Sequence, residues 1–367
     1  MRPAMWIGLA AFALAPAETR CQTAADTTLK VSFGGFIDGY YAYDVGRPPT
    51  LDRSFFGGAP FTTQPARANE FNVNLAYVEA NISGNRVHGR LALQAGTSVQ
   101  ANYAAEPTLG TVSGPSLSRL IQEGYAGYQV APTFWIDAGI FYSNAGMETW
   151  ASKDNPTYSR SLVADYSPYY SSGVRGIWQA TPRLAVRLDV VNGWQNISET
   201  NTDKGVGLRL DYVPTAPLMV SYYNFVNTER GNRVRVFDGV GAKLSAARTT
   251  LLGEIDYGTL GAGSTGVATA TWWGFTAVAK QQVVAMMALV GRIERYSDPE
   301  QVNIVTGLSA PFVGNSASLG VDVTPQSRVM WRTEVRGFFA EQLIFPNDGK
   351  GPRKNDGFVV TSLSLAF

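Results

Sequence analysis

The sequence predicts an all-β protein: a transmembrane antiparallel up-and-down β-barrel of about sixteen strands, with short periplasmic turns and long outer loops. Three features support this fold class: a low content of charge, segments of alternating polarity, and connections that alternate in length. Only 16% of the 367 residues are charged and 12% are aromatic, whereas soluble domains carry roughly 25% charged residues. Lipid-facing and lumen-facing residues alternate in such a barrel, so its apolar residues are spread thinly along the chain.

The N-terminus has the parts of a secretory signal peptide. Met1-Arg2 supplies positive charge, an apolar run extends from Ala4 to Ala15, and Ala15-Pro16-Ala17 has the pattern of a cleavage site. The run is shorter than the roughly 20 residues that span a bilayer. We expect residues 1–25 to form the signal peptide, with cleavage after Ala17 or after Ala25, and residues 26–367 to form the barrel. The alternative is a buried N-terminal helix.

The chain after residue 28 consists of segments in which apolar and polar residues alternate. In 184–192 the apolar residues alternate with Arg187 and Asp189, and in 205–213 with Arg209 and Asp211. This period predicts strands with one face toward lipid and the charged face toward a lumen. A slip of phase near Leu75-Ala76 indicates a bulge. The predicted strands are 29–44, 71–83, 87–97, 118–130, 134–144, 171–180, 184–194, 205–213, 218–227, 234–245, 249–257, 268–280, 284–296, 317–323, 329–339 and 357–367.

The connections between these strands alternate strictly in length. Short ones such as 84–86, 131–133 and 181–183 follow long ones such as 45–69, 98–117 and 145–170. A barrel with both termini in the periplasm predicts this alternation, and a soluble β-sandwich does not. The last strand ends on Phe367, a terminal aromatic that resembles the signal read by the barrel-assembly machinery of bacteria. Together with the signal peptide, it predicts the outer membrane of a Gram-negative bacterium.

A barrel of about sixteen strands leaves an aqueous lumen. Charged residues recur at spacing two on the face assigned to this lumen and therefore project to the same side. They could create a transverse field that orients polar solutes, or they could pair with one another to keep a polar wall structured. Mixed signs predict weak ion selectivity. The pore-lining candidates are Arg187, Asp189, Arg209, Asp211, Arg292, Glu294, Arg332, Glu334 and Arg336.

Ala145–Tyr170 is the third and longest outer loop. We expect it to fold inward and narrow the lumen, with Glu148, Lys153, Asp154 and Arg160 as constriction-loop candidates. The alternative is a surface loop that packs over the mouth of the barrel.

The same region carries a family resemblance. The sequence reads Gly139-Ile-Phe-Tyr-Ser-Asn-Ala-Gly146-Met-Glu148, followed by Ser159-Arg160-Ser161, Pro168–Arg175 and Asn192-Gly193-Trp194. These motifs resemble the β-barrel porin-2 (OmpL-like) family of bacterial outer-membrane proteins. The family's usual basic residue and proline fall at Ile140 and Asn144, so their roles do not carry over.

The resemblance implies a porin, a water-filled channel for passive diffusion of small polar solutes or ions, and leaves the solute open. The alternative function is a plugged structural or binding barrel that contacts a partner through its outer loops.

Enzymatic chemistry has little support in the sequence. His88 is the only histidine, which leaves little for a Ser-His triad or a histidine metal site. The glycine-rich segment 261–266 lacks the strand-to-helix context of a phosphate-binding loop. We expect no enzyme, no catalytic residue, no cofactor and no metal. With a net charge of +1, we expect no nucleic acid as a partner. The expected partners are outer-membrane lipid, the barrel-assembly machinery, small polar solutes and, by analogy, a homotrimer.

Overall fold

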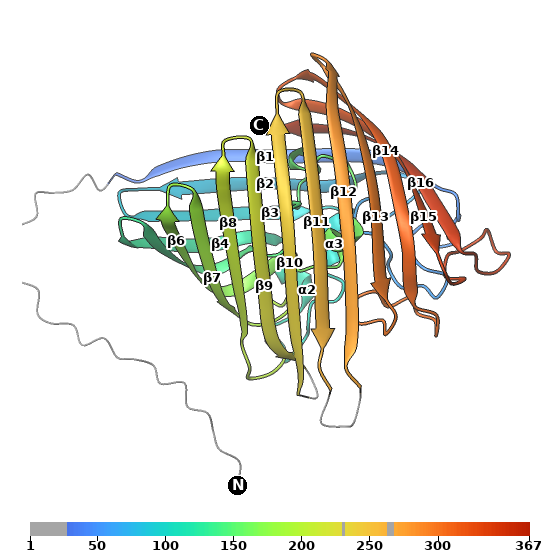
Figure 1. Ribbon diagram of the computed structural model, residues 1–367, viewed down its shortest axis with the longest axis horizontal. Helices are drawn as coiled ribbons and strands as arrows, with labels where there is room; N and C mark the ends of the chain where they lie inside the picture. The colour runs from blue at the N-terminus through green and yellow to red at the C-terminus, as the bar shows by residue number, and fades with distance from the viewer. Residues whose placement is uncertain (1–27, 230–231, 263–267) are drawn as a thin grey trace, which may run out of the picture.

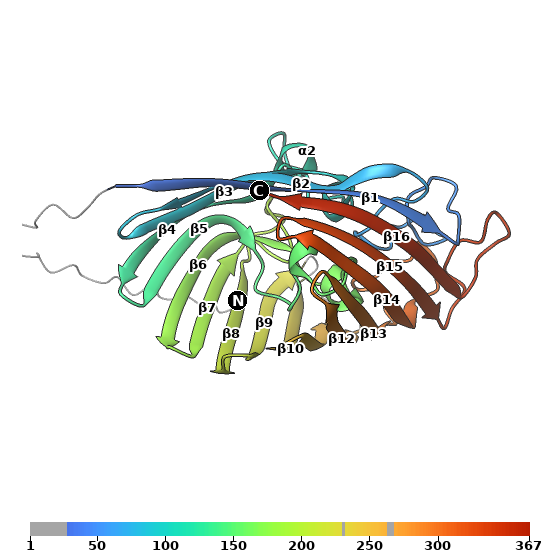
Figure 2. The ribbon, with the colours of Figure 1, turned by 90° about the horizontal axis from the view of Figure 1, so that it is seen from above.

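The computed structural model describes residues 28–229, 232–262 and 268–367, which form a closed antiparallel barrel. Every strand pairs with its neighbours in the sequence, and β1 pairs with β16 to close the ring. Figures 1 and 2 show the strands around a common interior, with short turns at one end and long loops at the other. Closure satisfies the backbone groups of both edge strands, as a hydrocarbon environment requires. The expected signal peptide lies outside the described residues.

The strands are β1 (Lys30–Asp44), β2 (Phe71–Ser83), β3 (Val87–Ala95), β4 (Ile121–Ala131), β5 (Phe134–Tyr142), β6 (Tyr170–Thr181), β7 (Leu184–Val191), β8 (Gly205–Thr215), β9 (Leu218–Glu229), β10 (Arg233–Ala246), β11 (Thr249–Leu260), β12 (Ala270–Val284), β13 (Met287–Asp298), β14 (Phe312–Gln326), β15 (Val329–Ala340) and β16 (Asn355–Ala366). The outer loops contain α1 (Thr97–Asn102), α2 (Pro115–Ser118), η1 (Ser152–Asp154) and α3 (Leu162–Asp165). Among the described residues, no helix has the length and apolar character to cross a membrane.

The predicted fold class and strand count are confirmed, and each predicted strand overlaps one strand of the structure. The bulge is confirmed as well, because the register between β1 and β2 shifts at Asp38/Gly39 and leaves Asn74 without a partner residue. The largest difference is at β14, which begins at Phe312 and not at residue 317. Its first residues, Phe312 to Ser316, do not alternate between apolar and polar. Asn315 pairs with Arg295 and Phe339 on the two neighbouring strands, which impose the extended conformation.

The alternation of side chains sorts the wall into two faces. On β15, Trp331 and Val335 are 55% and 54% exposed on the outer surface, whereas Arg332, Glu334 and Arg336 are each 1% exposed on the lumen side. An apolar outer face and a polar inner face are what a barrel in a bilayer requires.

The last residue seals the barrel. The backbone N–H of Gly35 donates to the carbonyl oxygen of Phe367 at 3.0 Å, and the N–H of Phe367 donates to Gly35 at 3.1 Å. The Phe367 ring lies over Gly35 so closely that a Cβ atom at Gly35 would stand 2.4 Å from it. The contact between the Phe367 ring and β1 therefore requires glycine at position 35.

Candidate functional site: the barrel lumen

The loop between β5 and β6, residues 143–169, enters the barrel, and we call it the inner loop. Its short helix α3 contacts β11, β12 and β13, and Figure 2 shows the green chain of this region inside the ring of strands. The backbone N–H of Ser159 donates to Glu334 at 2.7 Å, and that of Leu162 donates to Glu294 at 2.6 Å. Both carboxylates come from the lumen face of strands late in the chain. The inner loop thus lies against the wall inside the lumen.

Three arginines of the same wall fasten the inner loop by its carbonyl groups. Arg292 donates to Ser159 at 2.6 Å, Arg336 to Arg160 at 2.8 Å, and Arg332 to Pro156 at 2.6 Å. Carboxylates balance these cations: Glu294 lies 3.0 Å from Arg292 and 2.6 Å from Arg336, and Asp322 lies 2.8 Å from Arg332. Buried ion pairs of this kind hold geometry when their hydrogen bonds are complete. We call Arg292, Glu294, Arg332, Glu334 and Arg336 the loop clamp.

Two further anchors hold the inner loop on other sides of the barrel. On β1, Asp38 accepts a hydrogen bond from Ser152 at 3.0 Å. On β8, Arg209 donates to the carbonyls of Asn144 at 2.9 Å and Gly146 at 2.7 Å. The loop is therefore fixed near its start at residues 144–146, at Ser152, and again at residues 159–162.

The nine pore-lining candidates all lie on lumen faces, but most are covered. The side chains of Arg187 and Asp211 are 37% and 12% exposed and lie 3.4 Å apart. The other seven are buried, and five of them form the loop clamp: Asp189, Arg209, Arg292, Glu294, Arg332, Glu334 and Arg336. Contact with solute stays a prediction for Arg187 and Asp211. For the clamp residues, the contacts support a role in positioning the loop.

The four constriction-loop candidates separate into two kinds. The side chains of Lys153 and Asp154 are 28% and 49% exposed and pair with each other at 2.8 Å. Glu148 and Arg160 are buried within the loop, where Glu148 accepts from the N–H of Ser161 at 2.8 Å and Arg160 donates to Ala164 at 2.7 Å. Burial raises the pKa of Glu148 above its ordinary value of 4.5. Only the first pair is placed to meet a solute.

Ser159 was not among the site candidates, although it lies in the family motif; its hydroxyl donates to Glu334 at 2.9 Å and accepts from Arg292 at 2.8 Å. A serine carries no charge pattern, and its clamp partners lie on distant strands. The family motif Ser159-Arg160-Ser161 was the signal that could have pointed to it.

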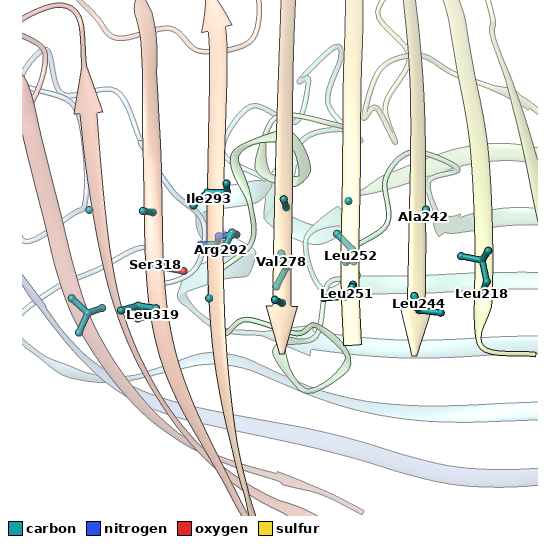
Figure 3. A pocket seen from close by; sticks show the side chains of 17 residues that line it. Leu218, Ala242, Leu244, Leu251, Leu252, Val278, Arg292, Ile293, Ser318 and Leu319 are labelled. Carbon is teal, nitrogen blue, oxygen red and sulfur yellow. The ribbon is translucent and has the colours of Figure 1, made fainter. Parts of the chain in front are cut away.

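A hollow of about 880 Å³ lies on the outer face of the wall and not in the lumen (Figure 3). Its floor contains Gly253, Ala277 and Gly291, and leucines such as Leu251 and Leu319 border it. Arg292 and Ser318 also border it, but they belong to the lumen face of their strands. This surface faces lipid, so the hollow is not part of the channel.

A closed barrel of sixteen antiparallel strands, with an apolar outside, a charged inside and a loop fastened within, defines an outer-membrane porin. The chain belongs to the family described as "Putative beta-barrel porin-2, OmpL-like", whose family model matches residues 30–367. The resemblance noted in the sequence and the outer-membrane location are thereby confirmed.

Several solved structures share this fold. An anion-selective porin from Comamonas acidovorans has a TM-score of 0.58 at 9% identity and covers 93% of this chain and 100% of its own. Salmonella typhi OmpF in complex with daunomycin has a TM-score of 0.56 at 14% identity, covering 92% and 97%. A trimer form of Vibrio cholerae OmpT has a TM-score of 0.56 at 8% identity, covering 92% and 99%. No curated protein matches the sequence.

Proposed function

We propose that this porin passes small polar solutes or ions passively through the part of the lumen that the inner loop leaves open, with no chemical step. The observation that carries the proposal is the fixed position of the inner loop across the lumen. The clamp holds it against β13 and β15, and Asp38 on β1 and Arg209 on β8 hold its other parts, so the proposed path for solutes runs between these contacts. The width of the passage then depends on the loop and not on the diameter of the barrel.

The charges beside the passage support weak selectivity. Arg187 and Asp211 on the wall, and Lys153 and Asp154 on the loop, are pairs of opposite sign that reach water. Fixed charges of both signs attract both kinds of ion, so neither is strongly excluded.

Single-channel recording tests the proposal. The refolded protein is placed in a planar bilayer and compared with a variant that lacks residues 153–158 of the inner loop. A control variant lacks residues 347–351 of the last outer loop, where Asp348 is exposed. We expect stable current steps from all three proteins and a larger step only from the inner-loop variant. Unchanged conductance would refute the constriction. Absence of steps from the wild type would favour the plugged barrel.

We also propose a homotrimer, since a solved structure of the same fold is described as a trimer form. Chemical cross-linking in detergent distinguishes three subunits from one.

A further inference from the structure

Lys243 is a lumen-facing cation that has no acidic partner. On β10, the buried residues Arg235, Phe237, Gly239 and Gly241 alternate along the lumen face, and Lys243 is the next residue on that face. Across the described residues, no carboxylate forms an ion pair or hydrogen bond with its ammonium group. An ammonium group in a wet lumen without a counter-charge is available to an anion from solution.

Glu254 on β11 does not neutralise Lys243. In the register of the two strands, Lys243 pairs with Leu252, and Glu254 pairs with Gly241. The carboxylate of Glu254 accepts hydrogen bonds from the N–H of Met147 at 3.2 Å and from the hydroxyl of Tyr223 at 2.5 Å. It is directed to the inner loop and is 2% exposed.

The position of Lys243 puts it next to the exit of the constriction. Met147 of the inner loop lies over Gly241, where a Cβ atom would stand 2.2 Å from its Cγ atom. β10 runs from an outer loop to a short turn after Ala246, so Lys243 lies on the periplasmic side of Met147. Lys243 therefore faces the part of the lumen between the inner loop and the periplasm.

The wall around Lys243 is rich in cations. Arg187 and Arg209 share the carboxylate of Asp211, at 3.4 Å and 2.8 Å. Farther along the wall, Lys280 and Arg332 share Asp322, at 2.5 Å and 2.8 Å. Each carboxylate therefore serves two cations.

The wall across the lumen has the opposite balance. Arg90 on β3 forms ion pairs with both Glu79 and Glu123, and Asp137 lies 2.6 Å from His88. In the ring of sixteen strands, β2 to β5 stand opposite β10 to β13. Lys243 and Lys280 thus stand across the ring from a group of three carboxylates and one arginine.

We propose that Lys243 contacts the anionic group of a solute, a carboxylate or a similar oxyanion, as the solute leaves the constriction. The negative wall attracts the cationic or hydrogen-bond-donating end of the same solute. The inference rests on the proposed function, since it needs an open passage beside the inner loop.

Reversal potentials in a salt gradient test it. We compare the wild type with Lys243→Gln, Lys243→Arg and the exposed-loop control Lys350→Gln, using potassium chloride and then potassium acetate as the carboxylate probe. Lys243→Gln is expected to lower the permeability of chloride and acetate relative to potassium by about two- to five-fold, the strength of one charge acting a few ångströms away in water. Lys243→Arg should keep the wild-type ratio, and Lys350→Gln should not change it.

The outcomes separate the two proposals. If Lys243→Gln conducts with an unchanged permeability ratio, Lys243 is not an anion contact and the channel function stands. If the same shift follows from Lys350→Gln, the effect is not local and the inference is wrong. If the wild type gives no current steps, the proposed function fails, and the inference fails with it.

Discussion

Gly35 and Phe367 meet at the seam where β16 closes on β1. A methyl group at Gly35 would stand 2.4 Å from the Phe367 ring and 2.8 Å from the carbonyl oxygen of Tyr77. The ring could turn aside, but the backbone carbonyl belongs to the sheet. We therefore expect Gly35→Ala to reduce the fraction of closed barrels. The difference in gel migration between unheated and boiled samples measures that fraction. Gly39→Ala is the matched control, because the nearest atom there is 3.9 Å away. An equal fraction of closed barrels in the two variants would contradict a requirement for glycine at position 35.

Glu148 should make stability depend on pH. Burial raises the pKa of this carboxyl above 4.5 in the folded protein, so the folded state binds the proton more tightly than the unfolded state does. Stability is then highest below pH 4.5 and falls as the pH rises through the raised pKa, where the buried group must ionise. Glu148→Gln removes this cost. We expect the unfolding temperature of Glu148→Gln to rise relative to that of the wild type between pH 4 and pH 7, measured by circular dichroism in detergent. A constant difference would contradict the assignment.

The strands were predictable because their signal is local. A period of two residues appears wherever one face meets lipid and the other meets water, and the short turns mark the periplasmic ends. The start of β14 escaped prediction because pairing with Arg295 and Phe339, and not the local pattern, makes Asn315 extended.

The inner loop was predictable in place but not in detail. Its length and the family motif indicated an inward fold. Lys153 and Asp154 lie exposed on the loop, and their contact with solutes stays a prediction. The roles of Glu148, Arg160 and Ser159 depend on contacts with residues far away in the sequence, and such contacts leave no local sequence pattern. Lys243 escaped prediction because its neighbours at spacing two, Gly241 and Ser245, carry no charge.

Ser159 joins the inner loop to the clamp, so Ser159→Ala should loosen the loop. Its hydroxyl contacts Glu334, Arg292 and Arg336, and alanine leaves these buried charges short of a partner. We expect a loss of about 1–3 kcal/mol of stability, together with larger fluctuations of the open-channel current. Thermal unfolding and current noise measure the two effects. Ser116→Ala, at an exposed position of α2, is the control. Open-channel current fluctuations as small in Ser159→Ala as in the wild type would argue against the clamp.

The whole molecule is surrounded by apolar side chains that water cannot solvate favourably. Phe33, Leu319 and Leu363 are 81%, 73% and 61% exposed on the outer face. We expect the protein without its signal peptide to be monodisperse only in detergent, with a circular dichroism spectrum typical of β-structure. Size-exclusion chromatography with and without detergent provides the measurement. Monodisperse protein in plain buffer would contradict a lipid-facing belt.

Export should leave a defined N-terminus. The predicted cleavage sites imply that the mature chain begins at Glu18 or at Asp26. Sequencing the N-terminus of protein purified from outer membranes checks this, and an intact Met1 would contradict the signal peptide.

The clamp also constrains the order in which the molecule assembles. Ser159 and Glu334 are 175 positions apart, and contacts so distant in the chain form late, after the intervening segments have been arranged. The inner loop cannot dock before β13 and β15 are in place. In an incomplete barrel the inner loop is therefore not yet docked across the lumen. The constriction forms only in the last steps of assembly.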